Sequence, residues 1–191
     1  MNIAIISFGS LIQTGEDRGL LINGQWHADG PILPIEFSRI SQGGERAGCL
    51  TLVIDEQHGT NVPTKYAESF HTNLNDAIQN LREVEGIKPE KAYTIGYVNL
   101  RDNKERRWSR IHTPVSCNTI RNWAIDKSFD AVVWVGLLPN FERITETPYS
   151  VENAIHYIEG LTQDVFIKTV EYIENSPAEI MTQFRQHTLC I

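Results

Sequence analysis

The sequence predicts an α+β domain on an antiparallel or mixed β-sheet, followed by a helical segment at the C-terminal end. Short apolar runs rich in β-branched residues, bounded by glycine, proline or polar turns, occupy the first two-thirds of the chain. From Ser150 onward the pattern is entirely helical. No linker, repeat or low-complexity tract divides the 191 residues, so we expect one domain over residues 1–191, with a helical extension from about residue 150.

Strand-like segments come first along the chain: residues 2–8, 32–41, 48–55 and 62–69. The first is continuously apolar up to Gly9-Ser10 and predicts a strand buried on both faces. The second and third flank a glycine turn and predict a hairpin. Pro63 restricts the fourth to an edge strand or a loop. Residues 14–30 are rich in glycine and charge and are predicted to wrap the surface, with Trp26 as an anchor.

Residues 72–86 predict an amphipathic helix. Its apolar side chains recur at positions i, i+3, i+4 and i+7, namely Leu74, Ala77, Ile78 and Leu81. Asn73 can cap its beginning, Gly86 can follow its end with positive φ, and Pro89 prevents it from continuing.

The remaining elements are predicted from the same signals. Residues 92–100 and 107–112 are strand-like and can pair across a charged turn, and residues 131–138 predict a core strand. Predicted N-caps begin four further segments of helix: Ser116, Ser150, Thr162 and Ser176. The last of these caps belongs to a capping box with proline at the first helical position.

One acidic side chain of the helix over residues 72–86 is predicted to point inward. At about 100° per residue, Glu85 projects about 20° from Leu74, inside the apolar stripe, whereas Glu83 points to water. Partial burial and the negative end of the helix macrodipole both disfavour the ionised form of Glu85. Both therefore raise its expected pKa towards the range of a general acid or base. The alternative is a frayed last turn that lets Glu85 swing out to solvent.

Two further positions are candidates for binding an anion. Gly9 and Ser10 allow a tight turn whose N–H groups converge on a carboxylate or phosphate oxygen, although a plain turn from strand to loop has the same sequence. Arg39 shares a strand face with Ile35 and Phe37, so its guanidinium either extends to water past apolar neighbours or binds an anion.

Composition excludes several classes of protein. A net charge of -7 argues against a nucleic-acid surface, which requires a basic face. The three cysteines are widely spaced and form no CxxC pair, as expected of reduced thiols in the cytoplasm. The N-terminal apolar run is too short and too quickly broken by glycine for a signal peptide, so secretion is not expected. No apolar run approaches the roughly 20 residues needed to cross a bilayer, so membrane insertion is not expected either.

Metal-dependent and nucleophilic chemistry lack sequence support. The six histidines show no HxxxH or HExxH spacing, Ser10 lacks the GxSxG context, and no cysteine has the context of an activated thiol. The turn after the first strand and the inward carboxylate remain. They suit a reaction without a cofactor in which an amine is deprotonated and an anionic substrate is held still.

Two stretches resemble the γ-glutamyl cyclotransferase-like family. Residues 6–11, Ile-Ser-Phe-Gly-Ser-Leu, are similar to the Y-G-S loop that opens the family, with Phe8 in place of the tyrosine and Leu11 where some members have asparagine. Residues 73–75 followed by 81–87, Leu-Arg-Glu-Val-Glu-Gly-Ile, are similar to the family's N-L-…-L-D-E-x-E-G-V segment. The two stretches occur in the family's order and at about its separation.

The resemblance implies a small mixed or antiparallel β-barrel, closed or nearly closed, surrounded by helices. It implies Glu85 as the general base, and the backbone of Phe8, Gly9, Ser10 and Leu11 as the cradle of the substrate, with Arg39 as a further candidate for its carboxylate. The family reaction is an intramolecular aminolysis that releases 5-oxoproline from a small γ-glutamyl compound without a cofactor.

Other functions fit the same residues. The chain could be a non-catalytic module that binds a small anionic ligand or a partner protein, or a hydrolase or amidotransferase with the same pocket. A salt bridge from Glu85 to an arginine such as Arg39 or Arg82 would favour a structural role for this carboxylate. The sequence carries no signal for an oligomeric state.

Overall fold

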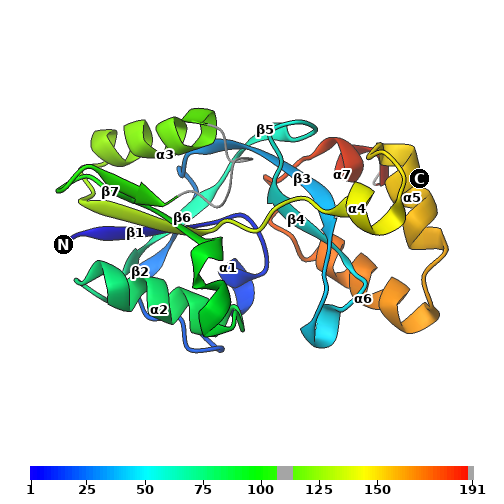
Figure 1. The fold of residues 1–191 in the computed structure, drawn as a ribbon, viewed down its shortest axis with the longest axis horizontal. Helices are drawn as coiled ribbons and strands as arrows, with labels where there is room; N and C mark the ends of the chain where they lie inside the picture. The colour runs from blue at the N-terminus through cyan, green and yellow to red at the C-terminus, as the bar shows by residue number, and fades with distance from the viewer. Residues whose placement is uncertain (107–113, 189–191) are drawn as a thin grey trace. The chain divides into compact units, whose positions relative to one another are not determined.

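The computed structural model describes residues 1–106 and 114–188 (Figure 1). Their contacts divide the chain into two compact units, each built from two separate stretches. The first unit comprises Met1–Leu33 and Pro63–Leu137, and the second comprises Pro34–Val62 and the described residues from Leu138 onward. Whether these units form a single domain, as expected from the sequence, stays a prediction.

The first unit is built on a six-stranded sheet. Its strands, in spatial order, are β2 (Ile22–His27), β6 (Lys65–Ser69), β1 (Ile3–Ser7), β9 (Ala131–Val135), β7 (Ile95–Asn99) and β8 (Lys104–Arg106). β1 runs antiparallel to β6 but parallel to β9, and β7 runs antiparallel to β9. The prediction of an α+β fold with a mixed sheet is therefore confirmed.

β1 lies inside this sheet, and all five of its residues are buried. Helix α2 (Leu74–Val84) covers one face of the sheet and α3 (Pro114–Asp126) covers the other, and both contact β7 and β9 (Figure 1). Alternate side chains of β1 thus point to two covered faces, which explains why residues 3–6 are apolar at every position rather than at every second one.

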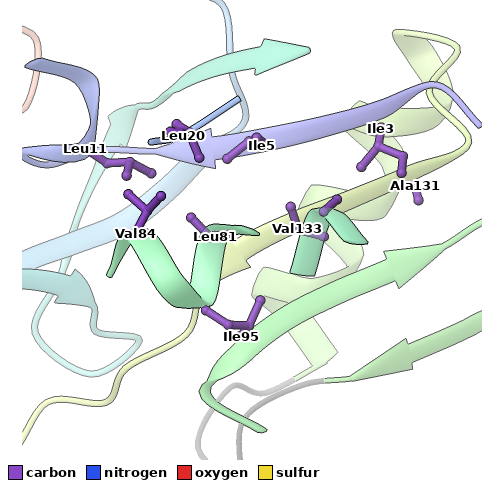
Figure 2. Packing of buried hydrophobic residues seen from close by; sticks show 10 residues of the cluster. Ile3, Ile5, Leu11, Leu20, Leu81, Val84, Ile95, Ala131 and Val133 are labelled. Carbon is purple, nitrogen blue, oxygen red and sulfur yellow. The ribbon is translucent and has the colours of Figure 1, made fainter. Parts of the chain in front are cut away.

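The face covered by α2 forms a hydrophobic cluster (Figure 2). Ala77, Leu81 and Val84 of the helix pack there with buried residues of the strands and of the segment after β1, namely Ile3, Ile5, Leu11, Leu20, Ile95, Ala131 and Val133. The side chain of Asn73 caps α2 by accepting a hydrogen bond from the N–H of Asn75, at 2.8 Å. The predicted helix and its cap are confirmed.

Short helices connect the strands of the first unit. Helix α1 (Leu11–Thr14) follows β1, and the 3₁₀ helix η2 (Pro89–Thr94) precedes β7. The segment over residues 14–30, expected to wrap the surface, contains the edge strand β2. Its sequence shows no apolar alternation, because each of its six residues is only partly buried or exposed.

The second unit contains most of a three-stranded sheet of order β4 (Leu50–Ile54), β3 (Ile32–Ile40) and β5 (Thr60–Pro63). β3 and β4 pair antiparallel on either side of the 3₁₀ helix η1 (Gly44–Arg46), which confirms the predicted hairpin. The register shifts between Glu36 and Arg39, so the strict alternation expected along β3 does not hold through this stretch.

Four helices complete the second unit among its described residues: α4 (Phe141–Thr145), α5 (Val151–Glu159), α6 (Gln163–Glu174) and α7 (Gln183–Thr188). The Ser150 hydroxyl caps α5 by accepting a hydrogen bond from the N–H of Asn153, at 3.1 Å, as predicted. The capping box expected at Ser176 begins no helix. Arg185 of α7 donates to the Pro177 carbonyl, at 2.5 Å, and Ile180 is fully buried, so tertiary contacts hold this segment as turns.

The expected β-barrel is not found in residues 1–106 and 114–188. The strands form two separate sheets, and the larger one ends at β2 on one side and at β8 on the other. Motifs of a few residues indicate which segments are strands, whereas closure depends on register and shear across the whole sheet. Within the same residues, no helix has the length and apolar character needed to span a bilayer.

Two strand predictions have other outcomes. The segment over residues 62–69 is divided at Thr64 into β5, which ends at Pro63, and β6, which is an inner strand paired on both sides. Pro63 therefore limits only the first part. The strand predicted at residues 107–112 lies outside the described residues, although β8, just before it, pairs with β7.

Candidate functional site

Glu85 stands at the C-terminal end of α2, immediately after Val84. Its own N–H donates to the carbonyl of Leu81 at 3.1 Å, so the backbone of the last turn is intact rather than frayed. Gly86 follows with φ of 63°, the left-handed conformation that glycine adopts without steric cost. This stop directs the chain away from the helix and leaves the side chain of Glu85 about three-quarters buried, at 23% exposure.

The side chain of Glu85 forms an ion pair with Arg18. The distance from Arg18 Nη2 to Glu85 Oε1 is 3.5 Å, and the arginine side chain is 33% exposed. Neither arginine considered from the sequence is this partner: Arg82 donates to the Ile87 carbonyl and pairs with Glu83. A positive charge beside Glu85 favours its ionised form, which opposes the effects expected from burial and from the helix macrodipole.

The turn after β1 leads directly into α1. Ser10 has φ of -60° and ψ of -17°, and its carbonyl accepts hydrogen bonds from the N–H groups of Gln13 and Thr14. Neither Gly9 nor Ser10 has positive φ, so the turn uses no left-handed residue. Phe8 and Leu11 on either side are buried. The convergence of N–H groups on an anion stays a prediction.

The two motifs that resemble the γ-glutamyl cyclotransferase-like family belong to the same unit and to the same hydrophobic cluster. Leu11, which follows Ser10, and Val84, which precedes Glu85, are both members of the cluster and are drawn in Figure 2. Arg18 adds a polar link, because its Nη1 donates to the Val84 carbonyl at 3.2 Å. The end of α2 and the segment after β1 are therefore in contact.

Arg39 belongs to the second unit, whereas Glu85 and the Gly9-Ser10 turn belong to the first. It is half-buried, and its Nη1 donates to the Leu138 carbonyl at 2.6 Å. Burial lowers the pKa of Arg39, and the neighbouring charge of Arg143 lowers it further. A desolvated guanidinium with a cationic neighbour favours an anion, but its carboxylate partner stays a prediction.

A buried polar cluster in the second unit was not predicted from the sequence. Glu36 has no exposed surface, and its carboxylate accepts hydrogen bonds from the N–H groups of Phe37, at 2.8 Å, and Phe184, at 3.4 Å. Burial raises the pKa of Glu36 despite these hydrogen bonds and one from Thr182. Nearby, Asp55 is also buried and raises it further. The sequence signal is an acid between two buried apolar neighbours, Ile35 and Phe37.

Asp55 and His58 lie in one turn of this cluster. Asp55 Oδ1 accepts hydrogen bonds from the N–H groups of Gln57 and His58, each at 3.0 Å, and His58 Nδ1 lies 3.4 Å from Asp55 Oδ2. The ring of Tyr149 lies 5.1 Å from that of His58. Burial, and then the charges of Glu36 and Asp55, raise the pKa of Tyr149 well above its ordinary value, so its hydroxyl stays protonated.

Residues 1–106 and 114–188 contain no group of three or more histidine, cysteine, aspartate or glutamate side chains that could hold a metal ion. Cys49 and Cys117 are buried free thiols, and Cys190 lies outside the described residues.

Comparison of the chain with protein-family models, with curated proteins and with solved structures gave no match.

Proposed function

We propose that this chain is a cyclotransferase, of the acyltransferase or lyase type, that releases 5-oxoproline from a small γ-glutamyl compound, with Glu85 as the general base. The observation that carries the proposal is a partly buried carboxylate at the end of α2, whose last turn contacts the segment after β1. Those are the two stretches that resemble the γ-glutamyl cyclotransferase-like family.

The reaction requires no cofactor. The ionised Glu85 takes a proton from the α-ammonium group of the substrate, and the freed amine attacks the γ-carbonyl carbon. A new carbon–nitrogen bond closes the five-membered ring. The protonated Glu85 then returns the proton to the leaving nitrogen as the original γ-amide bond breaks. The attacking nitrogen loses its second proton to Glu85, which passes it to the same leaving nitrogen. The products are 5-oxoproline and an amine, amino acid or peptide that departs as an ammonium ion.

Positioning supplies much of the expected rate. The amine and the γ-carbonyl belong to one molecule, so the protein only has to hold them in a folded conformation. We assign this role to the backbone of Phe8, Gly9, Ser10 and Leu11. The burial of Phe8 and Leu11 supports a rigid turn, because both side chains are held in place by packing.

The test is turnover by Glu85→Gln. Removal of a general base should lower the rate of 5-oxoproline formation by about 10²- to 10⁴-fold. The free energy of unfolding should change by about 1 kcal/mol or less, because the lost ion pair is partly exposed. Purified protein is incubated with γ-glutamyl dipeptides, γ-glutamyl amines and glutathione, and 5-oxoproline is quantified by mass spectrometry.

Glu83→Gln is the matched control. This side chain lies on the same helix, is exposed and pairs with Arg82, so its loss should leave the rate unchanged. A folded wild-type protein that forms no 5-oxoproline from any of these substrates contradicts the proposal. Full turnover by Glu85→Gln contradicts the role of Glu85.

A non-catalytic binding module is the second candidate. The observation that favours it is the ion pair between Glu85 and Arg18, since a carboxylate engaged by an arginine suits a structural role. This candidate predicts saturable binding of a small anionic ligand in calorimetry, with no product released, and equal binding by the wild type and Glu85→Gln.

A further inference from the structure

Arg18 links the segment after β1 to the end of α2. It follows α1, and its backbone N–H donates to the carbonyls of Thr14 and Gly15, at 3.1 Å each. Its Nε points back to the Thr14 carbonyl at 3.4 Å, while Nη1 donates to the Val84 carbonyl at 3.2 Å. The third nitrogen, Nη2, faces Glu85 Oε1 at 3.5 Å. A single guanidinium thus connects the last residue of α1, the last turn of α2 and the Glu85 carboxylate.

The hydrogen bond to the Val84 carbonyl determines where the guanidinium of Arg18 lies. The last carbonyls of a helix lack partners within the helix and form the negative end of its dipole. A planar guanidinium can satisfy one of these carbonyls and face an adjacent carboxylate at the same time, whereas the compact ammonium group of lysine cannot present such a fork. The hydrogen bond to Val84 therefore fixes where the positive charge stands relative to Glu85.

We propose that Arg18 is a positioning residue that keeps Glu85 ionised and orients its carboxylate in the free protein. A general base must start without its proton, yet burial and the helix end both favour the protonated form. The charge of Arg18 opposes both effects. The catalytic part of this inference rests on the proposed function, whereas the effect of Arg18 on Glu85 can be measured without any turnover.

The experiment combines a titration with a rate profile. The full chain is labelled with ¹³C at the glutamate carboxyl carbons, and the Glu85 signal is assigned by its loss in Glu85→Gln. In Arg18→Gln, the midpoint of the Glu85 titration should move to higher pH. The rate of 5-oxoproline formation should fall by about 10- to 100-fold, since a displaced catalytic group loses its alignment, and the deficit should be largest at low pH.

Two variants separate charge from geometry. Arg82 lies on α2 and donates to the Ile87 carbonyl, beyond the end of that helix. Arg82→Gln should therefore match the wild type in both the titration midpoint and the rate. Arg18→Lys should keep the titration midpoint of the wild type, because it keeps the charge. Its rate should still fall, because lysine has no fork that reaches both Val84 and Glu85.

The outcomes are distinct. Equal midpoints in Arg18→Gln and Arg82→Gln overturn the inference. A shifted midpoint in a protein that forms no 5-oxoproline supports the action of Arg18 on Glu85 and rejects the proposed enzymatic function. If Arg18→Gln does not fold, the ¹⁵N signal of Arg18 Nε in the wild type supplies the test. It should shift as Glu85 titrates, and should not do so in Glu85→Gln, and a signal that stays constant in the wild type overturns the inference.

Discussion

At the scale of single residues, two glutamates of this protein are treated differently by their surroundings. Glu85 is partly exposed and paired with Arg18, an arrangement that favours the carboxylate. Glu36 is fully buried, and burial is the largest effect on its pKa, which is raised. The first is suited to exchange a proton with a ligand. Burial disfavours the charge of the second, which accepts hydrogen bonds from two backbone amides in the core of the second unit.

Glu36 should make the stability of the protein depend on pH. Because its pKa is higher in the folded state, its contribution is complete below the ordinary glutamate pKa. The contribution is lost as the pH rises from there through the raised pKa. Over this window the free energy of unfolding should fall by up to about 1.4 kcal/mol per pH unit. Glu36→Gln should remove this slope and become more stable than the wild type as the pH rises. Urea unfolding, repeated at intervals of about one pH unit between about pH 4 and 8, measures this difference.

The exposed Glu90 provides the control for this comparison, since Glu90→Gln should follow the wild-type profile. If Glu36→Gln and the wild type keep a constant difference in stability across the pH range, Glu36 does not titrate with a raised pKa.

At the scale of elements, two strands of the first unit's sheet are in close contact at a glycine. Gly96 of β7 lies opposite Trp134 of β9, whose side chain is buried. A Cβ atom at Gly96 would lie 2.3 Å from the indole ring, well inside van der Waals contact. Glycine is thus required at this position because a side chain would collide with the indole ring of Trp134, and not because of an unusual φ angle.

Gly96→Ala should therefore destabilise the protein by about 1–3 kcal/mol, the usual cost of overpacking a core. The free energy of unfolding from urea denaturation measures this effect. Gly43→Ala is the matched control, because Gly43 has φ of -169° and no atom within 4 Å of its Cβ position, so its stability should stay at the wild-type value. If Gly96→Ala is no more destabilising than Gly43→Ala, the indole ring of Trp134 does not determine the cost.

At the scale of the whole molecule, the chain passes three times between two compact units. Each unit is completed by a segment from later in the sequence: β9 enters the sheet of the first unit, and α5 to α7 pack in the second. Neither stretch of a unit contains a complete core. Both units therefore need long-range contacts to form, which is typical of folds whose strands pair across a large sequence separation.

The division into units predicts where core substitutions act. Leu81→Ala in the first unit should cost about 2–5 kcal/mol, and Phe37→Ala in the second about 3–5 kcal/mol. Hydrogen exchange measured by mass spectrometry should rise mainly in β1, β7 and β9 for the former, and in β3, β4 and α7 for the latter. A uniform rise over both units, for either variant, would show that the molecule opens as one cooperative body.

Local signals in the sequence determined much of what surrounds the candidate site. The apolar spacing from Leu74 to Leu81, the cap at Asn73 and the left-handed glycine at Gly86 fix the beginning and end of α2, and so place Glu85 at its last turn. The apolar run over residues 3–6 predicts β1 as a strand buried on both faces. These features follow from periodicity and capping, which act over a few residues.

Tertiary structure alone decided the rest. The parallel pairing of β1 with β9, the inner position of β6 and the open sheet in place of a barrel depend on register between distant segments. Glu85 pairs with Arg18, and the burial of Glu36 arises where β3 meets α7. No spacing rule encodes these contacts. They result from packing the whole chain, in which burial, charge and hydrogen bonding at one residue are set by residues far away in sequence.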